Sequence, residues 1–162
     1  MLEMRLKILS LNVRGLGSPT KVNSLCHELE VLNFDIVLLQ ETHFSCLKQA
    51  KVFEQSWRGK CYWSFGIGKS AGVAVLLLPH FSGSVQRFLF DSDGRILSLL
   101  FTFGPLSKLN VINIYAPNLV FNLVISLPRR LINCWRLKLS TTLLINFNPI
   151  IFCPQIKIVS PL

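Results

Sequence analysis

The alternation of apolar and polar positions predicts a strand, a helix and a second strand at the start of the chain. Residues 6–13 alternate and then run apolar, which is typical of a strand. Apolar residues then recur every three or four positions, which predicts a helix capped by Ser18 or Thr20 and ending near Leu32. The unbroken apolar run 35–40 predicts a strand buried on both faces. The two strands of such a unit run parallel, so their carboxyl ends meet at one edge of a sheet.

A second helix is expected over residues 48–57, and the chain after it changes character. Short apolar stretches follow one another, separated by glycine, proline and aspartate turns. The strands expected from them cover 61–65, 72–78, 85–90, 95–103 and 109–115. Because no helical pattern separates these stretches, they favour an antiparallel meander. The whole pattern predicts an α+β fold with mixed, packed sheets and helices outside.

Composition sets limits on this picture and divides the chain near Asn118. The 162 residues, 51% of them hydrophobic, are enough for one domain with a real core, and the formal net charge is +9. Residues 119–162 hold five basic residues but no Asp, Glu, His or Gly. That segment therefore offers no general base of the usual kind and no carboxylate for a metal ion. We divide the chain into 1–118, the N-terminal portion of a domain, and 119–162, a degenerate or altered C-terminal segment that is expected to fold poorly.

Five cysteines without a CxxC pair predict reduced thiols in an intracellular protein, either nuclear or cytoplasmic. A zinc site from Cys26, His27, His43 and Cys46 is an alternative that the loose spacing disfavours. Charged residues near the N-terminus argue against a secretion signal, and no apolar run reaches the roughly 18 residues of a membrane span. We therefore expect neither secretion nor a membrane partner, and nothing in the sequence indicates a protein partner.

Rare polar residues stand where three of the expected strands end. The segments are SLNVRG at 10–15, LQETH at 39–43 and NIYAPN at 113–118. The Glu41 carboxylate suits Mg²⁺, which binds through one or two carboxylates and keeps several waters. Asn12 and Asn118 offer amide donors to phosphate oxygens, and the Tyr115 hydroxyl can stabilise charge on an attacked phosphorus. Taken singly each residue has a plainer explanation, since a strand-end Glu is usually solvated and an Asn beside a turn usually forms the turn.

Together and in this order, the motifs resemble the endonuclease/exonuclease/phosphatase superfamily. The most similar branch is the apurinic-endonuclease-like domain of non-LTR (LINE-type) retrotransposons, whose metal-binding motif has the form QETH. The resemblance covers about residues 5–118, including the strand GVAVLLL at 72–78 and the turn DGR at 93–95. It implies a four-layer α/β-sandwich with mixed sheets, here incomplete because part of the second sheet is missing.

The resemblance also implies roles for individual residues. Glu41 would ligate the catalytic Mg²⁺, or Mn²⁺ in its place, while Asn12 orients the metal and the reacting groups. Tyr115 would contact the scissile phosphate. The residues expected to bind substrate are Asn118, Arg14, His43 and Asn148, although His43 could equally be a packed neighbour of Glu41. The reaction would be hydrolysis of a DNA phosphodiester, a nick that leaves a 3′-hydroxyl for a reverse transcriptase to extend.

Two further family motifs are altered or absent. The segment LLINFN at 143–148 resembles an eroded Gly-Asp-Phe-Asn motif, with Asn146 where an aspartate would position the attacking water. A terminal Ser-Asp-His is missing. We interpret the chain as a truncated retroelement reading frame whose activity is weak or lost. Two alternatives stay open: a basic module that only binds nucleic acid, and a phosphatase of the same superfamily acting on lipid or inositol phosphates.

Overall fold

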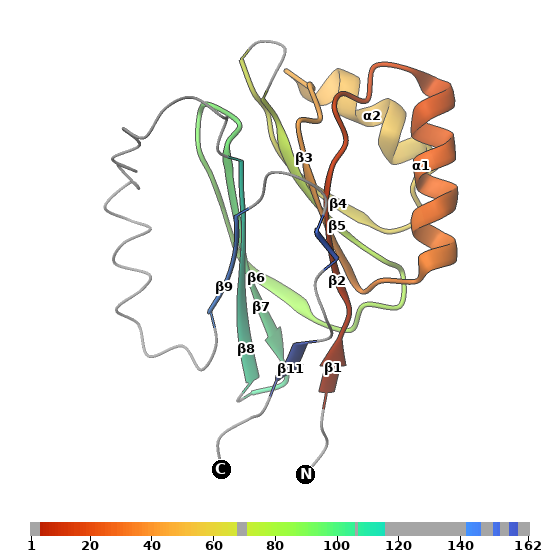
Figure 1. Ribbon diagram of the computed structural model, residues 1–162. Coiled ribbons are helices and arrows are strands. Elements are labelled where there is room, and N and C mark those ends of the chain that lie inside the picture. Colours follow the sequence, from red (N-terminus) through yellow and green to blue (C-terminus); the bar gives the residue numbers. More distant parts are fainter. Residues whose placement is uncertain are drawn as a thin grey trace.

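Two β-sheets face each other, and both helices cover the outer side of one of them (Figure 1). The computed structural model describes residues 4–67, 71–105, 107–115, 142–146, 151–152 and 156–158. This arrangement is a mixed α+β sandwich, which confirms the fold class predicted from the sequence. No helix in the part of the chain described here is long and apolar enough to cross a membrane.

The first sheet has the strand order β10-β2-β3-β5-β4. Its strands are β2 (Ile8–Asn12), β3 (Ile36–Gln40), β4 (Lys60–Ser64), β5 (Val73–Leu77) and β10 (Ile151–Phe152). Strands β2 and β3 are parallel, and their register pairs Asn12 with Gln40. The predicted strand, helix and strand at the start of the chain are therefore confirmed, and both strands end at the same edge.

The second sheet has the order β6-β7-β8-β9. Its strands are β6 (Ser84–Phe90), β7 (Ile96–Phe103), β8 (Ser107–Ile114) and β9 (Thr142–Asn146). Strands β6, β7 and β8 form an antiparallel meander, and β9 adds to β8 in parallel. A separate ribbon pairs β1 (Met4–Leu6) with β11 (Ile156–Ile158).

The expectation of one meander through all five later strands was wrong for the first two. Strands β4 and β5 do pair with each other, but β5 lies between β4 and β3 in the first sheet. The reason is burial, because every residue of β5 is buried. A strand buried along its whole length needs a neighbour on each side and cover on both faces.

Two apolar layers hold the sandwich together. One lies between the first sheet and the helices α1 (Pro19–Leu32) and α2 (Leu47–Ser56), where Phe53, Trp57 and Trp63 pack. The other lies between the two sheets and contains Leu38, Val75 and Leu99, among others. Helix α1 ends where Asn33 takes a left-handed backbone with φ 53°. At one end of the sandwich, this inter-sheet layer meets a polar edge.

Candidate active site

The candidate site lies at the edge of the sandwich where β2, β3 and β8 end. Asn12 is the last residue of β2, Glu41 follows β3, and Tyr115 follows β8. Parallel pairing of β2 and β3 sets the first two side by side. The main chain of Tyr115 is tied to the β6–β7 turn, because its N–H donates to the carbonyl of Arg95 at 2.8 Å. The two sheets thus each contribute to one polar edge.

Glu41 is the centre of this edge. Its Oε1 accepts a hydrogen bond from Asn12 Nδ2 at 2.8 Å and another from the Tyr115 hydroxyl at 2.9 Å. The Glu41 side chain is 20% exposed and Tyr115 is 6% exposed, so the contacts are largely shielded from solvent. The structure therefore brings together the three residues that the sequence placed at strand ends. Hydrogen bonds to a carboxylate are stronger than neutral ones and fix its orientation.

A left-handed backbone turns the Glu41 side chain into this position. Along β3, Leu39 faces the helices and Leu38 faces the other sheet, so regular alternation would direct residue 41 toward the helices. Glu41 instead has φ 53°, and Arg14 and His43 are left-handed as well, at 48° and 59°. Such conformations cost a side-chain-bearing residue about 1–3 kcal/mol and concentrate at functional sites. Here the turn delivers the carboxylate to Asn12 and Tyr115.

Two glycines, Gly15 and Gly72, lie in close contact with the 41–43 segment. Gly15 has φ 86°, and a Cβ added there would lie 2.7 Å from Nδ1 of His43. Gly72 has φ 98°, and its Cβ would lie 2.3 Å from Oγ1 of Thr42. Main-chain bonds join the same three loops, since Gly15 donates to the Glu41 carbonyl and Thr42 donates to the Gly72 carbonyl. Only glycine permits both the left-handed backbone and this close approach.

Tyr115 stays protonated well above neutral pH in this setting. Burial, the hydrogen bond to Glu41 and the charge of Glu41 raise the pKa of its phenol to about 12, although the charge of Arg95 acts in the opposite direction. The phenol is therefore a hydrogen-bond donor at every physiological pH.

His43 and Arg14 border the site in different ways. His43 Nε2 is buried, has no hydrogen-bond partner in the described structure, and lies 3.8 Å from Glu41 Oε2. Arg14 is exposed, and its main-chain N–H donates to Asn12 Oδ1 at 3.0 Å. Lys21 fastens the same loop, because its Nζ donates to the carbonyl of Val13 at 2.7 Å. His43 therefore lies next to the Glu41 carboxylate. The Arg14 main chain orients Asn12, and the exposed Arg14 side chain is available to a ligand.

Two of the predicted substrate-binding residues, Asn118 and Asn148, lie outside the described residues and remain predictions. The backbone of Asn146 is described, and it pairs with Ile114 in the parallel β8–β9 register. Strand β9 therefore ends at the same edge as β8, one strand away from Tyr115. This register supports the interpretation of residues 143–148 as an eroded motif, because it places residue 146 beside the candidate site.

Sequence reasoning missed a layer of buried polar side chains directly beneath the site. Ser10, Gln40 and Asn113 are each no more than 1% exposed and hydrogen bond to one another across the two sheets. The available signal was their place in the sequence, since each interrupts an apolar strand at a position that faces the sandwich interior. Gln40 and Asn113 belong to the QETH and NIYAPN segments, but no role had been assigned to them.

The donor set at Glu41 fits Mg²⁺ or Mn²⁺. Oε1 is occupied by two donors, whereas Oε2 accepts no hydrogen bond from the residues that the structure describes. A single carboxylate oxygen without a hydrogen-bond donor suits Mg²⁺, which fills the rest of its shell with water and substrate phosphate. The zinc alternative was wrong, because no cluster of three or more His, Cys, Asp or Glu with metal-binding geometry occurs in the described ranges.

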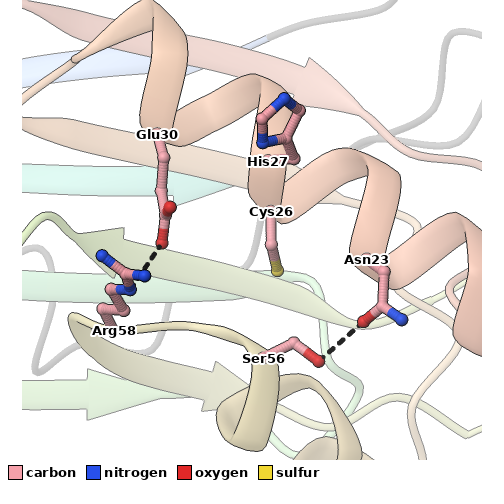
Figure 2. Close-up of a pocket in the computed structure, with 6 residues that line it drawn as sticks. All are labelled: Asn23, Cys26, His27, Glu30, Ser56 and Arg58. Atoms are coloured by element: carbon pink, nitrogen blue, oxygen red, sulfur yellow. Dashed lines mark hydrogen bonds and ion pairs between the residues drawn. The ribbon is translucent and has the colours of Figure 1, made fainter.

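A second pocket, of about 260 Å³, lies between α1 and the end of α2 (Figure 2). Figure 2 shows Glu30 directed toward Arg58 and Ser56 directed toward Asn23. The Glu30–Arg58 ion pair measures 3.7 Å, and Ser56 Oγ donates a hydrogen bond to Asn23 Oδ1 at 2.8 Å. Burial raises the pKa of the Cys26 thiol to about 11, so it is a neutral and weakly nucleophilic thiol. With its charges paired and its thiol neutral, this pocket offers less chemistry than the strand edge.

Comparison with known proteins shows the family of this chain. The model of the endonuclease/exonuclease/phosphatase family matches residues 9–148, which is most of the chain. The chain belongs to the endonuclease/exonuclease/phosphatase family. Members of this family hydrolyse phosphodiester bonds and commonly use divalent metal ions.

Solved structures share the fold at low sequence identity. AP endonuclease LMAP from Leishmania major is 20% identical, with a TM-score of 0.59 over 74% of this chain and 42% of that protein. Truncated TDP2 from Caenorhabditis elegans is 19% identical, with a TM-score of 0.54 over 72% of this chain and 48% of that one. The Xenopus laevis APE2 catalytic domain is 22% identical, with a TM-score of 0.52 over 72% and 46%. The chain spans less than half the length of each of these proteins.

Proposed function

We propose that this chain is a Mg²⁺-dependent DNA-nicking endonuclease domain of LINE-type retrotransposon descent, with greatly reduced activity in its present form. The observation that carries the proposal is the pair of hydrogen bonds that Asn12 and Tyr115 donate to one oxygen of Glu41. The second oxygen, Oε2, accepts no hydrogen bond from the described residues and lies 3.8 Å from Nε2 of His43. A carboxylate held in this way is prepared for a hard cation and a phosphodiester.

Each residue of the edge has a definite task in this proposal. Glu41 Oε2 would hold Mg²⁺ or Mn²⁺, which when bound neutralises charge on the substrate phosphate. Asn12 keeps the carboxylate in place. The Tyr115 phenol, whose single hydrogen is donated to Glu41 Oε1 in this structure, would turn that hydrogen to the scissile phosphate when substrate binds, and its raised pKa keeps it protonated at neutral pH. Arg14, His43, Asn118 and Asn148 are the proposed contacts to the DNA backbone.

The reduced activity follows from what the sequence lacks. The last carboxylate side chain of the chain is Asp93, and residue 146 is asparagine. An amide cannot accept the proton of the attacking water, and loss of one proton-transfer group typically costs about 10²–10⁴-fold in rate. The site would therefore bind metal and phosphate better than it turns over.

Support for DNA as substrate and for retroelement descent comes from motif forms and from similar folds. QETH and NIYAPN are the forms that resemble the retrotransposon branch. One similar structure is an AP endonuclease, whose activity is on DNA. The net charge of +9 suits a polyanionic partner. We place the protein inside the cell, in the nucleus or cytoplasm, where such a substrate is found.

A plasmid-nicking assay on a variant that regains the missing carboxylate tests the proposal. Purified wild type, Asn146→Asp and the double variant Asn146→Asp/Glu41→Gln are incubated with supercoiled plasmid and Mg²⁺. We expect Asn146→Asp to nick about 10²-fold faster than wild type, because it returns a carboxylate to the end of β9, the strand that pairs with β8. The added Glu41→Gln change should abolish that gain. Equal nicking by the double variant would show that Glu41 is not the metal ligand.

Two further outcomes would identify the alternatives. Plasmid retention that weakens steeply with salt, without nicking by Asn146→Asp, would favour a module that only binds nucleic acid. Release of phosphate from an inositol phosphate, while the plasmid stays intact, would favour the hypothesis of a phosphatase of the same superfamily. The basic charge supports the first alternative and the family membership allows the second.

A further inference from the structure

The buried polar layer beneath the site joins the two sheets through a single side chain of β8. The Asn113 amide donates to the main-chain carbonyl of Leu39 in β3 at 2.9 Å and to that of Ala74 in β5 at 2.8 Å. Its Oδ1 accepts a hydrogen bond from Gln40 Nε2 at 2.8 Å. Asn113 is fully buried, so all three bonds form away from water. One residue of the second sheet is thus fixed to two strands of the first.

Gln40 extends this layer to a third strand. Its Nε2 also lies 3.1 Å from Ser10 Oγ in β2. Each of these residues stands just below one member of the site. Ser10 is two positions before Asn12, Gln40 is directly before Glu41, and Asn113 is two positions before Tyr115. Hydrogen bonds therefore connect β2, β3 and β8, the three strands that carry the site, through the interior residues closest to the site.

Apolar packing alone does not determine how far β8 is shifted along β3. Below the polar layer the sheets meet through side chains such as Leu38, Val111 and Leu99, and hydrophobic contacts are non-directional. A small slide of one sheet on the other keeps most of that burial. The Tyr115 hydroxyl, however, meets Glu41 Oε1 at 2.9 Å, and the hydrogen bond weakens steeply if either strand moves.

We propose that Asn113 and Gln40 are positioning residues that fix the height of β8 against β3 and thereby deliver the Tyr115 hydroxyl to Glu41. They touch neither metal nor substrate. The inference deepens the proposed function, since it concerns the same site, but it predicts a geometry that can be measured without catalysis. A slide would leave buried amide and carbonyl groups unpaired, each at a substantial penalty, and this is what makes the layer directional.

The chain offers a matched control on the same strand. Asn110 is also in β8, is 3% exposed, and accepts a hydrogen bond from Ser98 Oγ at 3.0 Å. Its partner Ser98 belongs to β7 of its own sheet, so this bond does not join the two sheets. Asn110→Leu and Asn113→Leu both remove a buried amide from β8. Only the second removes the connection to β3 and β5.

The test is ¹⁹F NMR of protein labelled with 3-fluorotyrosine. The chain has two tyrosines, Tyr62 and Tyr115, so Tyr62→Phe assigns the signals. Glu41→Gln defines the shift of the Tyr115 resonance when its acceptor is altered. We expect Asn113→Leu to move that resonance by a comparable amount, and Asn110→Leu to leave it within its linewidth. The Tyr62 resonance, on β4, gives a second reading of the contact between the sheets, because its ring centroid lies 5.6 Å from that of Phe88 on β6.

A double variant separates positioning from simple loss of stability. Gln40→Met/Asn113→Leu removes both side chains of the Gln40–Asn113 hydrogen bond, so the Gln40 amide is not left without its acceptor, while the main-chain carbonyls of Leu39 and Ala74 lose their donor in the single and the double variant alike. We expect it to recover stability relative to Asn113→Leu while the Tyr115 resonance stays displaced. An unmoved resonance in folded Asn113→Leu or in the folded double variant would overturn the proposal, and so would an equal displacement in Asn110→Leu. None of these readings uses DNA cleavage, so a failure of the proposed function would be seen separately.

Discussion

Gly72→Ala should destabilise the protein because it disturbs the loop that carries Glu41. The Gly72 backbone has φ 98°, which costs an alanine about 1–2 kcal/mol. The new Cβ would also lie 2.3 Å from Oγ1 of Thr42, a side chain that is only 1% exposed and has little room to move. Repacking around such an overlap adds about 1–3 kcal/mol. We expect the free energy of unfolding to fall by about 2–5 kcal/mol in total.

Urea unfolding followed by tryptophan fluorescence measures this change, with Gly17→Ala as the control. A Cβ at Gly17 meets no atom within 4 Å, and its φ is not in the left-handed range. That variant should stay within about 0.5 kcal/mol of wild type. If both variants unfold at the same urea concentration, the idea that Gly72 is required by the close approach of Thr42 is refuted.

Three further changes follow from the same structure. Tyr115→Phe should flatten the alkaline stability profile: because the folded pKa of about 12 lies above the ordinary value of 10.0, wild type loses stability as pH rises through that interval, and urea titrations should show a smaller loss for the variant. A profile identical to wild type would contradict the Tyr115–Glu41 contact. Phe53→Ala should cost about 3–5 kcal/mol of unfolding free energy, because Phe53 is fully buried against Trp57 and Trp63. The neighbouring Val52→Ala, at a side chain 47% exposed, should cost less than about 0.5 kcal/mol in the same assay, and equal losses would speak against the packing described. Gly15→Ala should lower stability and, at the same time, move the Tyr115 ¹⁹F resonance, because its Cβ would displace His43 beside Glu41; an unchanged resonance would show that the two loops are independent.

The sequence was most informative where periodicity and strand direction act together. The helical spacing before Leu32 and the apolar run of β3 predicted a parallel β2–β3 pair, and that pair sets Asn12 beside the end of β3, where the left-handed turn at Glu41 completes the contact. The approach of Tyr115 depends on a second sheet. It was expected from the resemblance of the motifs and not from periodicity.

Three features could not be read from the pattern of residues. The short apolar run marks β5 as a strand but does not encode its neighbours, so its place between β3 and β4 required the three-dimensional packing. The left-handed turn at Glu41 has no local signal, since glutamate rarely adopts it. The partners of Asn113 lie 39 to 74 residues away in the chain, a separation over which periodicity carries no information. Asn118 and Asn148, like the division at Asn118, remain predictions.

The central claim is that Glu41 holds a divalent cation at this strand edge, and direct Mn²⁺ binding tests it without any substrate. Electron paramagnetic resonance counts free Mn²⁺ as it is added to wild type, Glu41→Gln and Glu30→Gln, the last being a carboxylate of α1 that pairs with Arg58. We predict that Glu41→Gln weakens Mn²⁺ binding by about tenfold or more while Glu30→Gln binds as wild type does. Equal affinity in wild type and Glu41→Gln would contradict the account.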